Sequence, residues 1–311
     1  MQSGGGPMTK RLGGLLVPIT TPFDAQTGEV APVALRGNAR ALLEAGVDGI
    51  LAAGSTGEAA LLSEDEYRQV IGWLRDVVPE DRWLLAGAGR ESTRATLAAC
   101  AVAADEGADA VLVRPPAYYG TSLPAAALAD HFRRVAEDSP IPVLLYNIPK
   151  YTHLTLPDTL FAALAEHENV VGAKDSSGDL KLFGAYRAAA PRWALFVGSG
   201  SHYYAALEMG AVGGILAVAC YAAPIAVRVG ERFAQGDRSG AGAAQEVLTP
   251  LNKDVVQRSG VPGVKAAMDA AGLTGGPVRA PLADLDAAER GRITALVTGA
   301  LREQLAGRGR S

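Results

Sequence analysis

Eight short apolar runs recur along the chain and constrain its fold more strongly than any other feature of the sequence. They are each 6–12 residues long and begin at Leu12, Gly46, Trp83, Ala108, Ile141, Val170, Leu195 and Val212. The runs are continuously apolar rather than alternating, as expected for parallel strands that helices cover on both faces of a sheet. We therefore predict eight parallel strands.

The segments between the runs carry helical patterns. The clearest is residues 63–78, SEDEYRQVIGWLRDVV, whose apolar side chains fall on one stripe. Ser63 and Glu66 form the sequence signature of a capping box at its start. Similar patterns predict helices at about 124–137 and 157–167. Strand–helix units repeated eight times predict a closed (β/α)8 barrel, or TIM barrel, of the α/β class. An open doubly wound sheet is less consistent, because no Gly-rich phosphate turn follows the first strand.

About 90 residues follow the eighth run. Helical patterns around 224–235, 245–256 and 262–271 are separated by glycine and proline, which predicts a helical extension packed against the side of the barrel. We therefore divide the chain into a flexible leader (1–11), the barrel (12–221) and a C-terminal helical extension (222–311). The opening MQSGGG lacks the apolar segment of a signal peptide.

The composition excludes several classes of protein. With 49% hydrophobic residues, 20% charged residues and a net charge of −4, the chain resembles an ordinary globular protein without a nucleic-acid partner. It contains no uncharged apolar stretch long enough to span a membrane, so we expect a cytoplasmic protein. Cys100 and Cys220 lie within apolar runs and are expected to be buried thiols. The four histidines show no metal-ligand spacing, and no metal site is expected.

Active sites of such barrels lie at the C-terminal ends of the strands, so polar residues there are the candidates for chemistry. The second run ends in GSTGE, where Ser55 and Thr56 offer hydroxyl and backbone donors to a carboxylate. The same turn is also consistent with simple loop capping. Tyr146 ends the fifth run and is suited to proton relay, although an isolated tyrosine there is more often a packing residue. Tyr119, after the fourth run, is likewise most simply a packing residue.

Lys174 is the sharpest candidate, because lysine is rare in the interior of a strand. It shares a face with Gly172, which leaves room for its stem, and with Ser176. Burial disfavours the charged form of an amine, and a nucleophilic Schiff-base lysine requires the neutral form. The alternative is that Lys174 pairs with Asp175 at a solvated strand end. Ser199 and His202 lack the surroundings of a nucleophile–base pair.

Four motifs, taken together and in order, resemble the dihydrodipicolinate synthase / N-acetylneuraminate lyase family. They are TTPF after the first strand, GSTGE after the second, YNIP after the fifth and GAKDSSGD on the sixth. The likeness extends from about residue 12 to residue 282. It implies a class I aldolase or related lyase in which Lys174 forms the Schiff base with a 2-oxo acid and Tyr146 relays protons. It also implies a homotetramer of paired dimers that needs no metal or organic cofactor.

The resemblance assigns roles to further residues. Ser55 takes the place of the relay hydroxyl, Thr56 that of the residue holding the substrate 1-carboxylate, and Tyr119 that of a tyrosine reaching into the neighbouring subunit. Gly198 and Ile215 fall where family members line the lysine pocket and the carboxylate site. Ser176, on the face of Lys174, is also expected to bind substrate.

The substrate is less strongly indicated. Synthases of the family carry an arginine two residues after YNxP, where this chain has Tyr151; the adjacent Lys150 is expected to point elsewhere, and an ammonium does not replace a bidentate guanidinium. Ser55 and the stretches GRESTRAT, DSPIPVLLYNIP and SGVPGVKAAMDAAGLTGGPVRAPL resemble the 4-hydroxy-2-oxoglutarate aldolase branch. We therefore expect retro-aldol cleavage of such an acid to pyruvate.

Other activities stay open at this point. One alternative is the synthase that condenses pyruvate with aspartate semialdehyde; related sugar-acid aldolases and dehydratases are others. A barrel that binds a 2-oxo acid without turnover is an alternative of another class, although binding alone does not need a lysine nucleophile. A metal-dependent aldolase would need clustered ligands that the sequence does not display.

Overall fold

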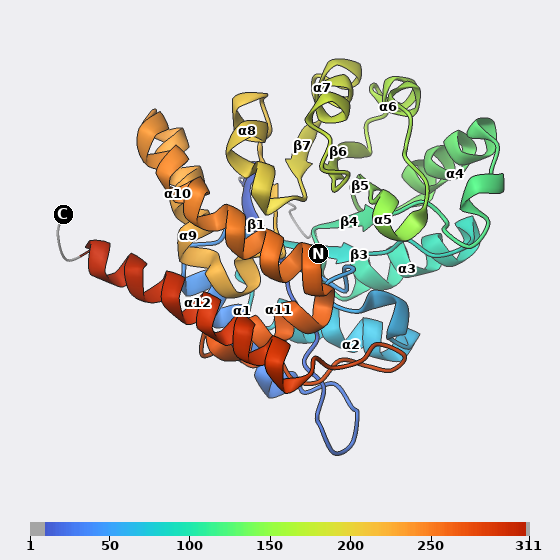
Figure 1. Cartoon of the computed structure of the whole chain (residues 1–311). Helices are drawn as coiled ribbons and strands as arrows, with labels where there is room; N and C mark the ends of the chain where they lie inside the picture. Colours follow the sequence, from blue (N-terminus) through green and yellow to red (C-terminus); the bar gives the residue numbers. More distant parts are fainter. Residues whose placement is uncertain (1–9, 309–311) are drawn as a thin grey trace, which may run out of the picture.

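The computed structural model describes residues 10–308, and within that range the chain forms a closed barrel of parallel strands in sequence order (Figure 1). The first and last strands pair with each other and close the barrel. Each of the eight apolar runs coincides with one strand, although the seventh strand begins one residue before its run, so the predicted (β/α)8 barrel is confirmed. The strands are β1 Gly14–Pro18, β2 Gly49–Ala52, β3 Trp83–Gly87, β4 Ala110–Val113, β5 Val143–Asn147, β6 Val170–Asp175, β7 Ala194–Val197 and β8 Gly213–Ile215.

Helices follow the strands and cover the outside of the barrel (Figure 1). The predicted capping box is confirmed: the Glu66 amide donates to Ser63 Oγ at 3.1 Å, and the Ser63 amide donates to Glu66 Oε2 at 2.8 Å. The helices up to the end of the barrel are α1 Pro32–Glu44, α2 Glu64–Arg75, α3 Thr93–Asp105, α4 Ala125–Asp138, α5 Pro149–Thr152, α6 Asp158–Leu164, α7 Leu180–Ala189, α8 Tyr203–Glu208 and α9 Ala219–Ala234.

The C-terminal extension contains α10 Arg238–Leu251, a π-helical segment Asn252–Gln257, α11 Arg258–Ala270 and α12 Ala287–Arg308. These helices pack on α9 and on one another (Figure 1). The boundary that we predicted between residues 221 and 222 falls inside α9, next to a non-helical residue at 222. The helix that follows β8 therefore begins before the predicted boundary.

The predicted leader lies mostly outside the described residues. Within them, Lys10 is already fixed, because its Nζ atom pairs with Asp109 Oδ1 at 2.8 Å and donates to the carbonyl of Arg82 at 2.8 Å. The flexible leader that we predicted to reach residue 11 therefore does not extend to Lys10.

Apolar side chains fill the inside of the barrel and the layer between strands and helices. The inner cluster includes Leu16, Leu51, Leu144, Phe196 and Ile215, each from a different strand. Such layers of branched and aromatic side chains make the barrel interior a packed core rather than a pore. The two cysteines are buried and free, as expected.

A buried ion pair joins the loop after β2 to α11. Glu58 Oε1 lies 2.5 Å from Lys265 Nζ, and the two side chains are 0% and 2% exposed. Lys265 also donates to the carbonyl of Pro277 at 2.7 Å, while Glu58 Oε2 accepts from the Arg279 amide at 2.8 Å. Burial lowers the pKa of the Lys265 amine, and the neighbouring Glu58 carboxylate opposes that shift. The extension is thus tied to the loop that carries GSTGE.

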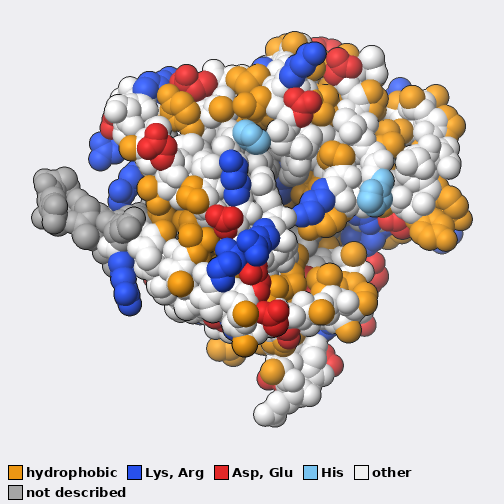
Figure 2. Space-filling model, in the orientation of Figure 1, with side chains coloured by type: hydrophobic (Ala, Val, Ile, Leu, Met, Phe, Trp, Pro, Cys, Tyr) orange, Lys and Arg blue, Asp and Glu red, His pale blue; other side chains and the backbone are white. Residues whose placement is uncertain are grey.

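The surface carries both signs of charge. On the face drawn in Figure 2, acidic and basic side chains are interspersed among apolar ones. Among the residues that the structure describes, no helix combines the length and the apolar character needed to cross a membrane.

Candidate active site

Lys174 and Tyr146 lie side by side at the C-terminal ends of β6 and β5, because the parallel register of these strands pairs the two residues. The Lys174 Nζ atom lies 4.5 Å from the centroid of the Tyr146 ring. The two residues are only 4% and 6% exposed. The lysine that the sequence singled out is therefore buried against a phenol at the mouth of the barrel.

Asp175 does not pair with Lys174. Its Oδ1 atom accepts from Asn147 Nδ2 at 2.8 Å and from the Ser177 amide at 3.1 Å, while Oδ2 accepts from Ser177 Oγ at 2.8 Å. Burial raises the pKa of the Asp175 carboxyl, and these hydrogen bonds oppose the shift. The alternative of a solvated Lys174–Asp175 pair is therefore wrong, and Asp175 instead holds the ends of β5 and β6 together.

Gly198 provides the space for the lysine. A Cβ atom added there would lie 3.0 Å from Lys174 Cε and 1.9 Å from Ser176 Oγ. Gly172, to which the sequence interpretation gave this function, instead allows close strand packing, since a Cβ atom there would lie 2.2 Å from the carbonyl oxygen of Ala194 on β7. The sequence interpretation assigned the clearance to the wrong glycine.

The GSTGE loop after β2 brings its hydroxyls to the same place. Ser55 and Thr56 line one cavity with Lys174 and Tyr146. A hydrogen bond from the segment after β1 fixes this loop, because Thr21 Oγ1 donates to the carbonyl of Gly57 at 2.7 Å. Two neutral hydroxyls beside a buried amine form a suitable site for an acid with a carbonyl next to its carboxylate.

This cavity has a volume of about 390 Å³, the size of a small-molecule site. Six of the eight residues expected from the sequence line it: Lys174, Tyr146, Ser55, Thr56, Ser176 and Gly198. The wall opposite the strands comes from the π-helical segment and α11, including Asn252, Gln257, Gly260, Val261 and Val264. The extension thus lines the site, in addition to packing on the barrel side as predicted from the sequence.

Two expected site residues lie elsewhere. Tyr119 is 69% exposed on the loop after β4, packs edge-on against Tyr118 with centroids 4.8 Å apart, and is absent from the described walls of the cavity. Ile215 belongs to the buried apolar cluster inside the barrel and does not line the described cavity either. Within one chain, neither residue belongs to the described lining of the cavity around Lys174.

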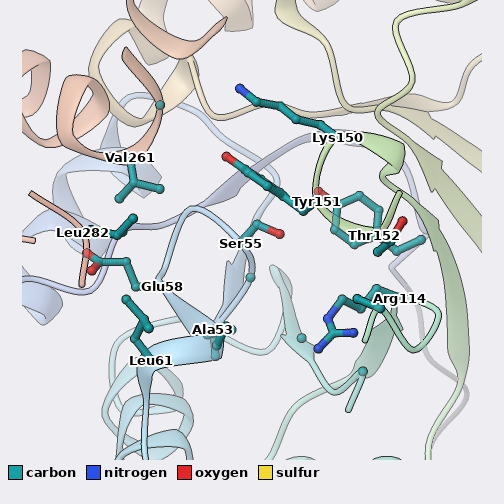
Figure 3. A pocket seen from close by; sticks show the side chains of 18 of the residues that line it. Ala53, Ser55, Glu58, Leu61, Arg114, Lys150, Tyr151, Thr152, Val261 and Leu282 are labelled. Carbon is teal, nitrogen blue, oxygen red and sulfur yellow. The ribbon is translucent and has the colours of Figure 1, made fainter. Parts of the chain in front are cut away.

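Lys150 lines the cavity, contrary to the expectation that it points elsewhere. It lies on α5, the single helical turn after β5, and its side chain runs beside that of Tyr151 towards Val261 (Figure 3). The Lys150 Nζ atom lies 5.6 Å from the Tyr151 ring centroid. Tyr151 is 47% exposed, and the burial of the rest of its side chain raises the pKa of its phenol, so the side chain is neutral near pH 7.

A second cavity of about 640 Å³ adjoins the first and shares Ser55, Tyr146, Lys150 and Tyr151 with it (Figure 3). Its other lining residues include Arg114, Glu91, Arg258, Glu58, Leu61 and Leu282. The two cavities therefore adjoin at the mouth of the barrel, and Lys174 lines the smaller one.

Several residues that line the site were not assigned to it from the sequence. Ser199 lines the lysine cavity, and its buried Oγ atom has no hydrogen-bond partner among residues 10–302, whose side chains the structure describes. Asn252 and Gln257 lie about 80 residues beyond Lys174 in the sequence, on a segment without a strand-end signal. Their π-helical backbone is a type often found at functional sites. Within the described range, no three His, Cys, Asp or Glu side chains gather as a metal site would require.

Comparison with solved structures supports the fold throughout. A prophage protein of the dihydrodipicolinic acid synthase family from E. coli K12, in complex with pyruvate, superposes with a TM-score of 0.88 at 26% identity, covering 93% of this chain and 98% of that one. A chloride-inhibited dihydrodipicolinate synthase from Acinetobacter baumannii, complexed with pyruvate, also has a TM-score of 0.88 at 29% identity, covering 93% and 99% of the two chains.

Sequence comparison identifies the family. An uncharacterized DapA-like lyase from Halobacterium salinarum is 36% identical over 91% of this chain and 92% of its own length. A 4-hydroxy-tetrahydrodipicolinate synthase from Methanopyrus kandleri is 35% identical over 86% and 90% of the two chains. These names support the family rather than its 4-hydroxy-2-oxoglutarate aldolase branch. The dihydrodipicolinate synthetase family model matches residues 11–300. The chain therefore belongs to the dihydrodipicolinate synthetase family and is a lyase of that family.

Proposed function

We propose that this lyase is a Schiff-base aldolase that cleaves a 4-hydroxy-2-oxo acid, of the 4-hydroxy-2-oxoglutarate type, into pyruvate and an aldehyde. The observation that carries the proposal is the position of Lys174. The residue is 4% exposed, its amine lies against the Tyr146 ring, and it lines a cavity together with Ser55 and Thr56. A buried amine beside hydroxyl groups is suited to attack a carbonyl carbon. Solved relatives that bind pyruvate support the 2-oxo acid.

The reaction proceeds through an iminium ion. Lys174 Nζ attacks the C2 carbonyl carbon, and the carbonyl oxygen leaves as water. The C3–C4 bond then breaks as its electron pair moves towards the iminium nitrogen, while the proton of the 4-hydroxyl passes to Tyr146. The aldehyde leaves, and the remaining enamine takes up a proton at C3. Water hydrolyses the resulting imine, which releases pyruvate and restores the amine.

The other site residues have supporting roles in this proposal. Ser55 and Thr56 hold the 1-carboxylate and pass protons, and Ser176 with Gly198 shapes the space around the amine. Ile215 supports the carboxylate site from the barrel interior. The exposed Tyr119 reaches the neighbouring subunit of a homotetramer, where it completes the proton relay. We place this assembly in the cytoplasm, with no metal and no organic cofactor.

The choice of substrate rests on Tyr151. Its neutral phenol stands two residues after YNIP, where the synthases carry a guanidinium that grips the aspartate semialdehyde carboxylate. The rival proposal is 4-hydroxy-tetrahydrodipicolinate synthase, and the names of several relatives favour it. The third proposal is a non-catalytic barrel that only binds a 2-oxo acid. It does not explain why Lys174 is buried without a carboxylate partner.

A substrate panel separates these proposals. We expect pyruvate release from 4-hydroxy-2-oxoglutarate, followed with a coupled lactate dehydrogenase assay, to exceed the condensation of pyruvate with aspartate semialdehyde. The reverse ranking would establish the synthase instead. Pyruvate binding without turnover of any 4-hydroxy-2-oxo acid or of aspartate semialdehyde would support the non-catalytic barrel. Lys174→Ala is the matched control, and its residual rate gives the background.

A further inference from the structure

The walls of the lysine cavity carry positive charge that no acidic residue balances. Its described lining includes two lysines, Lys150 and Lys174, and no aspartate or glutamate. The rest of the lining is neutral, with hydroxyl, amide and apolar side chains. A cavity of this kind favours anions over cations. Once Lys174 has formed the iminium with the 2-oxo group, Lys150 is the remaining lysine of the described lining with a free ammonium group.

Lys150 is also the one basic residue of the joined cavities that is free to meet a ligand carboxylate. Four basic residues of the described chain line the two cavities. Arg114 is held by Glu91 at 2.9 Å, and Arg258 lies 3.5 Å from Glu289. Lys174 is assigned to the 2-oxo group. Among the side chains of residues 10–302, which the structure describes, Lys150 forms no ion pair, and its Nζ atom lies 5.6 Å from the centroid of the neutral Tyr151 ring.

The backbone that carries Lys150 is fixed in place. Thr152, at the end of α5, is fully buried, and its Oγ1 atom donates to the carbonyls of Ile148 and Leu154 at 3.0 and 3.1 Å. Lys150 lies four positions after Tyr146 in the sequence. The ammonium group therefore stands on a flexible stem whose base is anchored next to the reacting centre, where the far end of a substrate would pass.

We infer that Lys150 determines specificity by binding the second carboxylate of a 2-oxo diacid, at the end of the substrate that becomes the aldehyde. The inference rests on the proposed function, since it supposes that Lys174 holds the 2-oxo group. The ammonium group of Lys150, on the helical turn α5 after β5, would then bind this carboxylate. The neighbouring Tyr151 is neutral and cannot form an ion pair with it. The substrate class is therefore a 2-oxo dicarboxylate rather than a sugar acid with a single carboxylate.

Calorimetric titration of the full chain with 2-oxoglutarate and with 2-oxobutanoate tests this inference without requiring cleavage. Both probes have the 2-oxo acid group, and only 2-oxoglutarate has a second carboxylate. We expect Lys150→Gln to raise the Kd of 2-oxoglutarate about tenfold, the loss expected for one charge-assisted contact, and to change that of 2-oxobutanoate less than about twofold. Lys150→Arg should retain most of the selectivity. Lys181→Gln, at an exposed lysine on α7, should alter neither Kd.

The selectivity for 2-oxoglutarate should also diminish as the salt concentration rises. Equal effects of Lys150→Gln on both probes, no effect on either, or a wild-type chain that does not prefer 2-oxoglutarate would overturn the inference. Failure of the proposed function gives a different result from failure of this inference. In that case the chain does not cleave 4-hydroxy-2-oxoglutarate, but its binding selectivity still depends on Lys150.

Discussion

The buried pair of Glu58 and Lys265 allows a quantitative prediction. Lys265→Met keeps most of the side-chain volume and removes the cation, which leaves Glu58 Oε1 without a partner and the carbonyl of Pro277 without its donor. The remaining contact of the carboxylate is the Arg279 amide at Oε2. Breaking a buried ion pair by removing one partner costs about 3–5 kcal/mol, since the other charge stays buried. We expect a loss in that range in the free energy of unfolding.

Urea unfolding at pH 7 and constant protomer concentration measures this loss. The control is Arg192→Gln, which breaks an ion pair with Glu166 whose side chains are 69% and 79% exposed, and it should cost less than about 1 kcal/mol. The double variant Glu58→Gln/Lys265→Met should cost clearly less than the sum of the two single changes. A Lys265→Met cost no larger than that of Arg192→Gln would refute the reasoning.

Three other outcomes follow from the same structure. Burial lowers the pKa of His131 to about 4, so the folded state binds fewer protons than the unfolded state, whose histidine has a pKa of about 6.5, and stability falls as the pH decreases between these values. In thermal or urea unfolding, the His131→Gln variant should lose about 2 kcal/mol less of its free energy of unfolding than the wild type when the pH falls from 7 to 5. An unchanged pH dependence of stability would contradict this. Tyr146→Phe should lower kcat about 10²- to 10⁴-fold while borohydride still traps pyruvate, and near-normal turnover would exclude Tyr146 as the proton carrier. Pyruvate release should persist in EDTA, and its loss would favour a metal-dependent aldolase.

The barrel and its reactive lysine are predictable from the sequence because both have local signals. Continuous apolar runs indicate strands covered on both faces, and their eightfold recurrence with helices indicates closure. Lys174 breaks an apolar run at a strand end, which is an unusual environment for a charge. The capping box of Ser63 and Glu66 is likewise local, and the structure confirms it.

The remaining features depend on tertiary contacts. The sequence does not reveal which glycine admits the lysine stem, because the clearance at Gly198 depends on the neighbouring strand β6. Lys150 stands on a helix of four residues, too short for a periodic pattern, and its backbone is anchored by hydrogen bonds of the buried Thr152 that the sequence does not signal. Asn252 reaches the site only through packing of the extension, and Tyr119 requires a second subunit to take the place proposed for it.

Trapping of the intermediate tests the central claim most directly. The full chain is incubated with pyruvate and sodium borohydride, digested and analysed by mass spectrometry. The account predicts one pyruvate-derived secondary amine, located on Lys174, that is absent in Lys174→Ala and present in Lys150→Gln. A folded wild-type chain that gains no adduct, or that carries it on another lysine, would contradict the account.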